Sequence, residues 1–310
     1  MAFLEDMRQV SSASLKLLAN PAAFVREIKF LLQADPQNYY AFLGDDVLEA
    51  QDQGFEQAQK PLWLNLGYWK TARTYPEAAA DLARKLAAAA KLGPGDVVLD
   101  AGFGFAEQDL LWVREYDVAR IIGVNVTKLH VDVARERAKA FGLQDRLDLR
   151  LASATELPLE AASVTKVVAL ESAFHFDTRE RFFDEALRVL EPGGILATAD
   201  CMPYLGEKPS GLVNWLGWRR WGVPPANIYD SDAYREKLLA RGFENVTVES
   251  IRHHVFPGMH RYAELRHRGV SLADARIELS QADIDSCLGV EDWRKQGGLT
   301  DYVIVSAQKA

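Results

Sequence analysis

The chain has 310 residues, of which 48% are apolar and 26% charged, a composition typical of folded soluble proteins and not of disordered or fibrous ones. Lys and Arg number 36 against 44 Asp and Glu, and the resulting net charge of -8 disfavours nucleic acid or an anionic membrane as the partner. The apolar runs fall far short of the ~18 residues that cross a bilayer, and the N-terminus lacks the pattern of a signal peptide. We therefore expect a cytoplasmic protein that acts on a small molecule.

Metal and disulfide chemistry find little support in the sequence. Cys201 and Cys287 are the two cysteines, and neither has a paired spacing with Cys or His that would suggest zinc. We interpret both as ordinary thiols. No group of Asp, Glu and His shows the spacing of magnesium ligands, so we predict no metal site. The sequence leaves the formation of a homo-oligomer open.

The first predicted elements are helices over residues 1–60, where apolar residues recur at helical spacing between prolines. These residues carry no chemical motif. Residues 59–69 form an aromatic-rich loop. A helix follows, because Pro76 suits a first helical turn and Leu82 and Leu86 fall on one face.

Strand-like segments begin near residue 97 and alternate with segments of helical length. Their apolar runs cover residues 97–99, 121–124, 147–151, 164–170 and 194–199. Most lack strict alternation of apolar and polar residues, which indicates a parallel sheet covered on both faces. Two further runs follow at residues 246–251 and 302–307, beyond a helix predicted over residues 232–241. We expect a Rossmann-like, doubly wound α/β fold.

The segment from Met202 to Asp230 combines aromatic residues with repeated prolines and glycines, and it is too long for a plain connector. We expect a lid over the ligand-binding edge of the sheet. Tyr204, Trp215 and Trp218 would contact an apolar or flat ligand, or else form only the hydrophobic interior of the lid. An anionic ligand remains an alternative because several arginines lie nearby, although such charges usually face solvent. They are Arg219, Arg220, Arg252, Arg261 and Arg266.

A glycine-rich turn follows the first predicted strand. Gly102 and Gly104 lie between that strand and the next helix, where the backbone can approach a ligand closely. Asp100 ends the strand just before them. A carboxylate suits an ammonium group and would repel a diphosphate, so the turn disfavours a nicotinamide cofactor.

These motifs resemble those of class I S-adenosylmethionine-dependent methyltransferases. The resemblance rests on Asp100-Ala-Gly-Phe-Gly104, on Glu191-Pro-Gly-Gly194 and on the spacing of seven strands, and it covers residues 60–200 and 230–310. It implies a seven-stranded, mostly parallel sheet with an antiparallel last strand, and S-adenosyl-L-methionine as cofactor. The segments 65–69, 122–127 and 169–176 are similar to the group of erythromycin-type sugar O-methyltransferases, tocopherol methyltransferases and isoprenoid-diphosphate C-methyltransferases.

The resemblance also divides the chain into four parts. Residues 1–90 would form a helical cap with the aromatic cofactor loop, and residues 91–200 the cofactor-binding core. Residues 201–230 would form the lid. Residues 231–310 would complete the core, with a helical insertion.

The cofactor site follows from the same resemblance. It would be lined by Tyr68, Asp100, Gly102, Phe103, Gly104, Asn125, Val126, His130, Ser153, Ala154 and Leu170. Asn125 stands where most relatives carry an acidic residue for the ribose, and its amide can both donate and accept. Ser153 replaces an Asp that often binds the adenine amine. His130 replaces a Gln and is either a ligand contact or an exposed helix residue, and Tyr68 either closes over the cofactor or only packs.

His175 and Glu171 are the candidate catalytic residues, because both follow the fourth strand at the edge where ligands bind. A neutral histidine with a pKa near ~6.5 suits removal of a hydroxyl proton, so we expect the rate to rise through its titration. Glu171 would orient the ring if the two residues form one helical turn. Alternatively, Glu171 contacts the cofactor region and His175 only caps or packs.

Three functions therefore compete. The first is methyl transfer to a hydroxyl or carboxyl of a small, largely apolar metabolite, in natural product biosynthesis. The second is C-methylation of an isoprenoid diphosphate, in which Glu171 would stabilise a carbocation. The third is a noncatalytic S-adenosylmethionine-binding module.

Overall fold

The computed structural model describes residues 61–204, 218, 222–267, 276–288 and 300–310. The helices predicted over residues 1–60 lie outside these ranges, as does most of the expected lid with Trp215.

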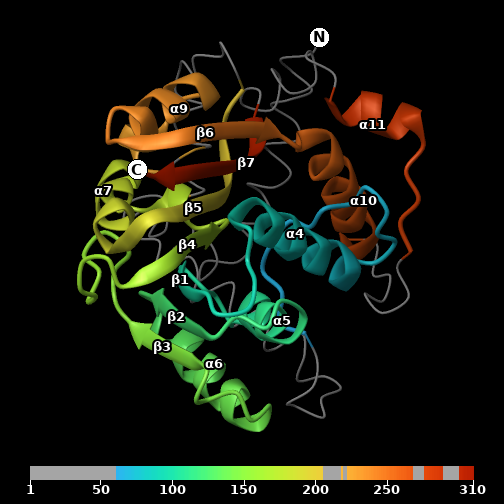
Figure 1. The fold of residues 1–310 in the computed structure, drawn as a ribbon. Helices are drawn as coiled ribbons and strands as arrows, with labels where there is room; N and C mark the ends of the chain where they lie inside the picture. The colour runs from blue at the N-terminus through green and yellow to red at the C-terminus, as the bar shows by residue number, and fades with distance from the viewer. Residues whose placement is uncertain (1–60, 205–217, 219–221, 268–275, 289–299) are drawn as a thin grey trace, which may run out of the picture.

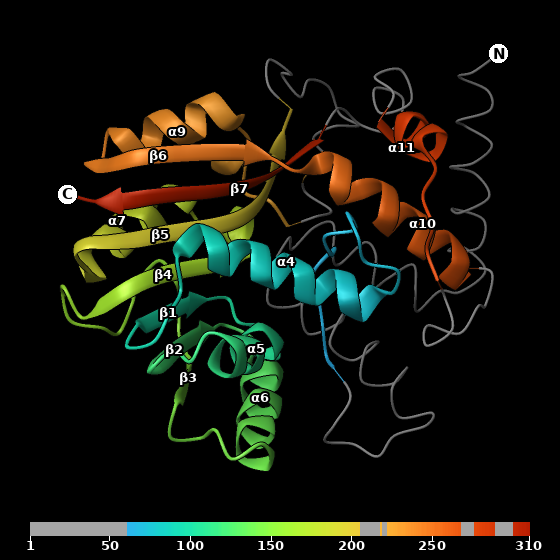
Figure 2. The same cartoon turned by 45° about the vertical axis from the view of Figure 1, so that its right-hand side comes forward.

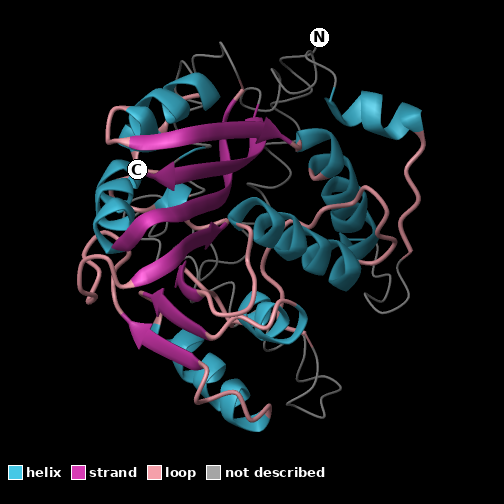
Figure 3. Cartoon of the chain, viewed as in Figure 1, coloured by secondary structure: helices cyan, strands magenta, loops and turns pink. Residues whose placement is uncertain are grey.

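A seven-stranded sheet forms the centre of the molecule, with its strands in the order β3-β2-β1-β4-β5-β7-β6 (labelled in Figure 1, magenta in Figure 3). The strands are β1 (Val97–Ala101), β2 (Arg120–Asn125), β3 (Leu147–Leu151), β4 (Val164–Leu170), β5 (Leu190–Pro203), β6 (Phe243–Ser250) and β7 (Thr300–Lys309). β7 runs antiparallel to both of its neighbours, and the other pairs are parallel. The predicted Rossmann-like fold with an antiparallel last strand is thus confirmed.

The strand directions fix where a ligand site can form. Because only β7 is reversed, the carboxyl ends of six strands meet the amino end of β7 at one edge of the sheet. In doubly wound sheets, ligands bind along this edge, and we call it the ligand edge.

Helices cover both faces of the sheet (Figures 1 and 2). They are α4 (Tyr75–Ala90), α5 (Glu107–Glu115), α6 (Lys128–Ala140), α7 (Arg179–Val189), α9 (Ser231–Leu239), α10 (Phe256–His267) and α11 (Gln281–Leu288), with short 3-10 turns η1 (Ala173–His175), η2 (Pro225–Asn227) and η3 (Arg252–His254). The helices α4, α5 and α6 share one buried apolar cluster with the sheet, and α7 and α9 share the other. Neighbouring strand residues alternate between them, since Val98 belongs to the first cluster and Leu99 to the second.

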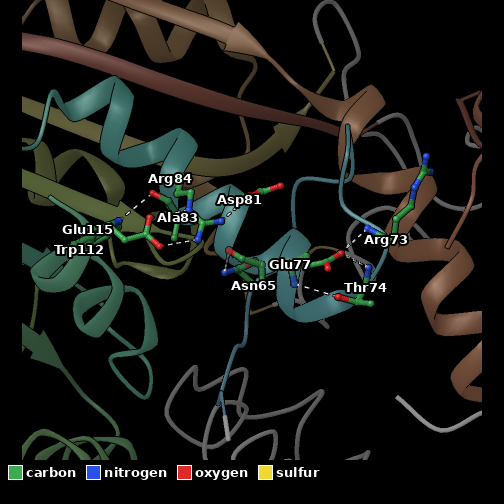
Figure 4. A network of polar contacts seen from close by, with 10 residues as sticks. Asn65, Arg73, Thr74, Glu77, Asp81, Ala83, Arg84, Trp112 and Glu115 are labelled. Atoms are coloured by element: carbon green, nitrogen blue, oxygen red, sulfur yellow. Dashed lines mark hydrogen bonds and ion pairs between the residues drawn. The ribbon is translucent and has the colours of Figure 1, made fainter. Parts of the chain in front are cut away.

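α4 is fixed at its start and along its length (Figure 4). Thr74 and Glu77 form a capping box, which satisfies backbone N–H groups that the first turn leaves unpaired. Arg84 bridges α4 to Glu115 at the end of α5, with 2.7 Å between its Nη2 and Oε1. The indole of Trp112 donates to the carbonyl of Ala83 at 3.0 Å. α4 therefore belongs to the layer that covers the sheet.

β5 begins earlier than the sequence indicated, at Leu190 instead of Gly194. Leu190 pairs with Val164, and a bulge separates this pair from the regular ladder. A Cβ at position 194 would lie 2.9 Å from the carbonyl oxygen of Thr165, so only glycine fits there. The Pro-Gly-Gly motif, expected to precede the strand, is part of it. Among the described residues, no helix is long and apolar enough to span a membrane.

Candidate functional site

The glycine turn lies at the ligand edge, at the end of β1. Gly102 has φ +91° and donates its N–H to the carbonyl of Val124 at 2.8 Å. A Cβ there would lie 2.4 Å from the Cβ of Ser172, so glycine is required for the strands to meet. Gly104 has φ +57°, and a Cβ on it would lie 3.2 Å from Leu64 Cδ1.

Asp100 lies beneath this turn in a buried pair of carboxyl groups. Gln108 Nε2 donates to Asp100 Oδ2 at 2.9 Å and to the carbonyl of Phe103 at 3.0 Å. Asp109 is also fully buried, beside Asp100, and burial raises the pKa of both acids. Two adjacent carboxylates cannot both remain charged there, so the pair holds a proton at neutral pH. Apart from that proton, Asp100 Oδ1 meets no donor among the described residues.

Two aromatic residues of the turn point into the core. Phe103 is fully buried, and a Cβ on Gly123 would lie 2.6 Å from its ring. Phe103 can therefore offer a ligand only its backbone. Phe105 packs on His130, with ring centroids 4.4 Å apart. His130 is 1% exposed, so it is not the exposed helix residue that the sequence left open.

The other predicted cofactor residues line the ligand edge beside β1. Asn125 ends β2, and its Oδ1 accepts the N–H of Thr127 at 3.0 Å, so the amide NH2 is the group that it can offer to a ligand. The hydroxyl of Ser153 bonds the hydroxyl of Thr155 at 2.9 Å in the loop after β3. Three apolar members complete the set: Val126 in the turn after β2, the buried Ala154, and Leu170 at the end of β4.

The loop predicted over residues 59–69 contains a strap over the glycine turn, whose backbone contacts the sequence did not indicate. Residues 62–66 cross the ligand edge, held at each end by a carboxylate that accepts a backbone N–H. Glu107 Oε2 accepts from Leu62 at 2.7 Å, and Glu171 Oε1 accepts from Leu66 at 2.8 Å. Between them, Leu64 lies against Gly104. No sequence signal marks such backbone contacts between distant segments.

Tyr68, expected either to close over the cofactor or only to pack, follows the strap and packs against the core. Its ring meets His254 at a centroid distance of 5.3 Å, and Lys85 Nζ lies 5.9 Å from the ring centroid. Its N–H donates to the carbonyl of Ala78 at 2.8 Å. Leu64 is the loop residue on the glycine turn, and a cofactor contact by Tyr68 stays a prediction.

Glu171 stands directly after β4, in a left-handed conformation with φ +52°. Its Oε1 accepts the hydroxyl of Tyr302 at 2.6 Å as well as the N–H of Leu66. Burial raises the pKa of Glu171 to about 7, against these two hydrogen bonds, which favour the charged form. Glu171 therefore changes charge near neutral pH.

His175 does not lie one helical turn from Glu171, because the left-handed residue interrupts the helical geometry and only Ala173–His175 form a 3-10 turn. The ring is 6% exposed, and its Nδ1 lies 3.3 Å from the carbonyl oxygen of Gly222. Burial lowers the pKa of His175 to about 3. The expected titration of this residue near neutral pH is therefore wrong, and His175 is neutral throughout the physiological range.

The far side of the ligand edge is formed by β5, β7 and β6. Tyr204 follows β5 and is half-buried, with Arg252 stacked on its ring at 4.6 Å. Trp218 is 8% exposed and belongs to a core cluster, which favours the packing alternative for this residue. Trp215 lies outside the described residues. Within those residues, no group of three or more His, Cys, Asp and Glu is placed to hold a metal ion.

A family model described as a methyltransferase domain matches residues 99–198, which span β1 to β5. The erythromycin 3''-O-methyltransferase of Saccharopolyspora erythraea is 36% identical over 263 residues, which cover 82% of this chain and 86% of that protein. The chain belongs to the S-adenosylmethionine-dependent methyltransferases. A second relative of this methyltransferase is the 27-O-demethylrifamycin SV methyltransferase of Amycolatopsis mediterranei, 31% identical over 80% of this chain and 91% of that one.

Solved structures share the fold. The [4+2]-cyclase SpnF superposes with a TM-score of 0.65 at 24% identity, over 89% of this chain and 96% of that one. A geranyl diphosphate C-methyltransferase from Streptomyces coelicolor A3(2), bound to S-adenosyl-L-homocysteine, gives a TM-score of 0.63 at 19% identity over 82% and 94%. At these identities the likeness concerns the fold alone.

The residues present fit the cofactor of this family. Asp100 Oδ1 is a buried acceptor at the glycine turn, suited to an ammonium group, and the turn keeps backbone free of side chains at Gly102 and Gly104. Asn125 carries an amide at the end of β2 that suits a ribose hydroxyl, and this contact stays a prediction. S-adenosylmethionine is the cofactor of this methyltransferase.

Proposed function

We propose that this enzyme methylates a hydroxyl oxygen of a small, largely apolar natural product. The observation that carries the proposal is the position and acidity of Glu171. Its carboxyl stands at the end of β4, between the glycine turn of β1 and the Tyr204–Arg252 side, and burial raises its pKa to about 7. A hydroxyl acceptor must lose its proton, and a base that titrates near working pH does this best.

The cofactor supplies a methyl group on a positively charged sulfur, so the protein has chiefly to position the acceptor and exclude water. Asp100, the glycine turn and Asn125 would hold the cofactor, and the strap of residues 62–66 would cover it. Glu171 would then take the acceptor's proton at its carboxylate.

His175 has a different part in this proposal from the one the sequence suggested. Since its ring is neutral, it would contact the acceptor as a hydrogen-bonding group without a charge. Its Nδ1 lies beside the carbonyl of Gly222, a residue within the segment expected to form the lid. A carboxyl acceptor would arrive deprotonated and would need no base, so the pKa of Glu171 favours a hydroxyl.

C-methylation of an isoprenoid diphosphate is the second candidate, because a carboxylate at the end of β4 would also stabilise a carbocation. A diphosphate needs several positive charges around it. On the described part of the ligand edge, Arg252 is buried close to the acidic Asp301. This arrangement of charges favours methylation of an oxygen atom over C-methylation of a diphosphate. A small-molecule acceptor and a cytoplasmic location belong to the same proposal.

The test is transfer of a carbon-13-labelled methyl group from S-adenosylmethionine to a chosen acceptor. Two acceptors follow from the relatives: erythromycin lacking its 3''-O-methyl group, and 27-O-demethylrifamycin SV. We expect a mass gain of one methyl group on at least one of them, with a labelled carbon whose chemical shift is that of an O-methyl group. Geranyl diphosphate is the comparison acceptor. Its C-methylation, with both hydroxyl acceptors left unchanged, would overturn the proposal.

A further inference from the structure

Arg252 occupies an unusual position on the ligand edge. It begins η3, separated from the end of β6 by one residue, and it is 4% exposed. Its guanidinium stacks on the ring of Tyr204 at 4.6 Å, beside the carboxyl end of β5. Charged side chains are rarely buried to this degree unless they are paired.

Two donors of this guanidinium have no acceptor. Among the described residues, nothing accepts a hydrogen bond from Nε or Nη2 of Arg252. These two nitrogens form one edge of the planar group, the edge that binds two oxygen atoms side by side. Leaving such donors buried and unpaired costs about 1–3 kcal/mol or more, so a residue kept for folding alone would not be expected to do so.

Arg179 shows what a structural arginine looks like in the same molecule. It is 0% exposed, and its Nε lies 3.0 Å from Asp200 Oδ2. Its Nη1 donates to the carbonyl of Asn227 at 2.9 Å. Arg179 Nε makes no hydrogen bond either, but it faces the carboxylate of Asp200 within ion-pair distance. Among the described residues, the Nε–Nη2 edge of Arg252 has neither a hydrogen bond nor an ion pair.

The local charges limit what Arg252 can bind. Asp301 is 3% exposed, and its Oδ1 accepts from the N–H of Tyr302 and from the hydroxyl of Ser250. Burial raises the pKa of Asp301, and the neighbouring Arg252 favours its charged form. The two side chains interact electrostatically but form no ion pair among the described residues, so Asp301 offsets part of the positive charge of Arg252 and the site holds less surplus charge than a lone arginine would. It therefore suits one pair of oxygen atoms and not a diphosphate.

Arg252 is also fixed relative to the proposed proton acceptor. Ile251, just before it, donates its N–H to the carbonyl of Tyr302 at 2.8 Å. The hydroxyl of the same Tyr302 donates to Glu171. Arg252 and Glu171 thus stand on two sides of one rigid strand, both at the ligand edge.

We propose that Arg252 binds the methyl acceptor by donating from Nε and Nη2 to two neighbouring oxygen atoms. This inference rests on the proposed function and adds a substrate class to it: an acceptor that carries a carboxylate or two vicinal hydroxyls beside its apolar body. Tyr204 holds the plane of the guanidinium by stacking on it.

Binding of small probes to the protein loaded with S-adenosylhomocysteine tests this without turnover. Benzoate carries a carboxylate and cis-1,2-cyclohexanediol carries vicinal hydroxyls. Benzyl alcohol and cyclohexanol are the matched compounds with one oxygen. We expect the wild-type protein to bind at least one two-oxygen probe ten-fold more tightly than its matched compound, measured by calorimetry. The probe that binds more tightly shows whether the oxygen pair belongs to a carboxylate or to vicinal hydroxyls.

Arg252→Met should remove this preference, and Arg252→Lys should not restore it, because a lysine lacks the planar edge. Arg252→Met also removes the charge that favours ionisation of Asp301, so the melting temperature of the free protein is measured beside binding to separate lost stability from lost preference. Arg241→Met is the control, since Arg241 pairs with Glu180 and Asp184 away from the ligand edge. It should keep the wild-type preference.

Two results would overturn the inference. One is the absence of any two-oxygen preference in the wild-type protein, and the other is the same preference in both Arg252 variants. If Arg252→Met does not fold, the inference is tested by the probe preference of the wild-type protein and of Arg252→Lys. If the protein binds S-adenosylhomocysteine but transfers no methyl group, the proposed function is refuted. The binding preference for two-oxygen probes is a separate result and does not depend on that outcome.

Discussion

At the scale of single residues, Gly104 has two properties that a control variant can tell apart: its positive φ and its closeness to the predicted cofactor. Gly104 and Gly142 both have positive φ, +57° and +67°, so alanine strains the backbone at either position. Nothing lies within 4 Å of a Cβ at position 142. Only position 104 lies in the turn that would meet the cofactor.

Gly104→Ala should therefore weaken binding of S-adenosylhomocysteine at least ten-fold, as measured by calorimetry. Gly142→Ala is the matched control and should lose about 1–2 kcal/mol of stability without a change in affinity. Equal affinity in both variants would mean that the glycine turn does not approach the cofactor.

The residue scale also shows where sequence reasoning succeeded and where it stopped. Asp100, Gly102 and Gly104 could be predicted because a strand followed by a glycine turn is a local pattern. The acidity of His175 and Glu171 could not, because it follows from burial among residues distant in sequence. Arg252 was named only as one arginine among several, since a sequence does not distinguish a buried unpaired guanidinium from a solvated one.

At the scale of elements, the strap is attached to α4 through Asn65. Its Oδ1 accepts the N–H of Gly67 at 3.0 Å, and its Nδ2 donates to the carbonyl of Ala79 at 3.2 Å. Asn65→Ala leaves these buried groups unpaired, which should cost about 1–3 kcal/mol of stability. It should also weaken binding of S-adenosylhomocysteine, because the strap loses one of its attachments near Gly104.

Thr74→Ala is the control for this prediction. It removes the N-cap of α4 and should cost about 1 kcal/mol, with cofactor affinity unchanged. Chemical unfolding and calorimetry measure the two quantities separately. If both variants lose affinity equally, stability of α4 and not the strap controls cofactor binding.

The elements themselves differed in how far they could be predicted. The bounds of β3 and β4 agree with the predicted strands. The last four residues of β4 are buried, as expected for a central parallel strand, whereas β3 alternates apolar and charged residues at the edge of the sheet. The strap has no such signal, since backbone N–H groups and two distant glutamates hold it. The prediction of a helical turn from Glu171 to His175 was wrong, because Glu171 adopts a left-handed conformation.

At the scale of the whole molecule, burial of a neutral histidine makes stability depend on pH. The pKa of His175 is lowered to about 3 in the folded state, against about 6.5 in the unfolded chain. Between these values the unfolded state binds more protons, so this residue makes stability rise with pH and fall as the pH drops below about 6.5.

His175→Gln should flatten this dependence by up to ~1.4 kcal/mol per pH unit between about pH 4 and 6. Urea unfolding at several pH values measures the slope. The exposed His253→Gln is the control and should keep the wild-type slope. An unchanged slope in His175→Gln would show that the ring is not neutral and buried in solution.

The strand order places Glu171 between the two sides of the ligand edge. The pH dependence of turnover tests the role of Glu171 most directly. With an acceptor found by labelled methyl transfer, kcat of the wild-type enzyme should rise with pH through about 7 as the carboxylate forms. Glu171→Gln should lower kcat by ~10²–10⁴ and remove this rise, while cofactor affinity is kept. His175→Gln should keep the rise near pH 7. A rise that survives in Glu171→Gln and disappears in His175→Gln would contradict the account.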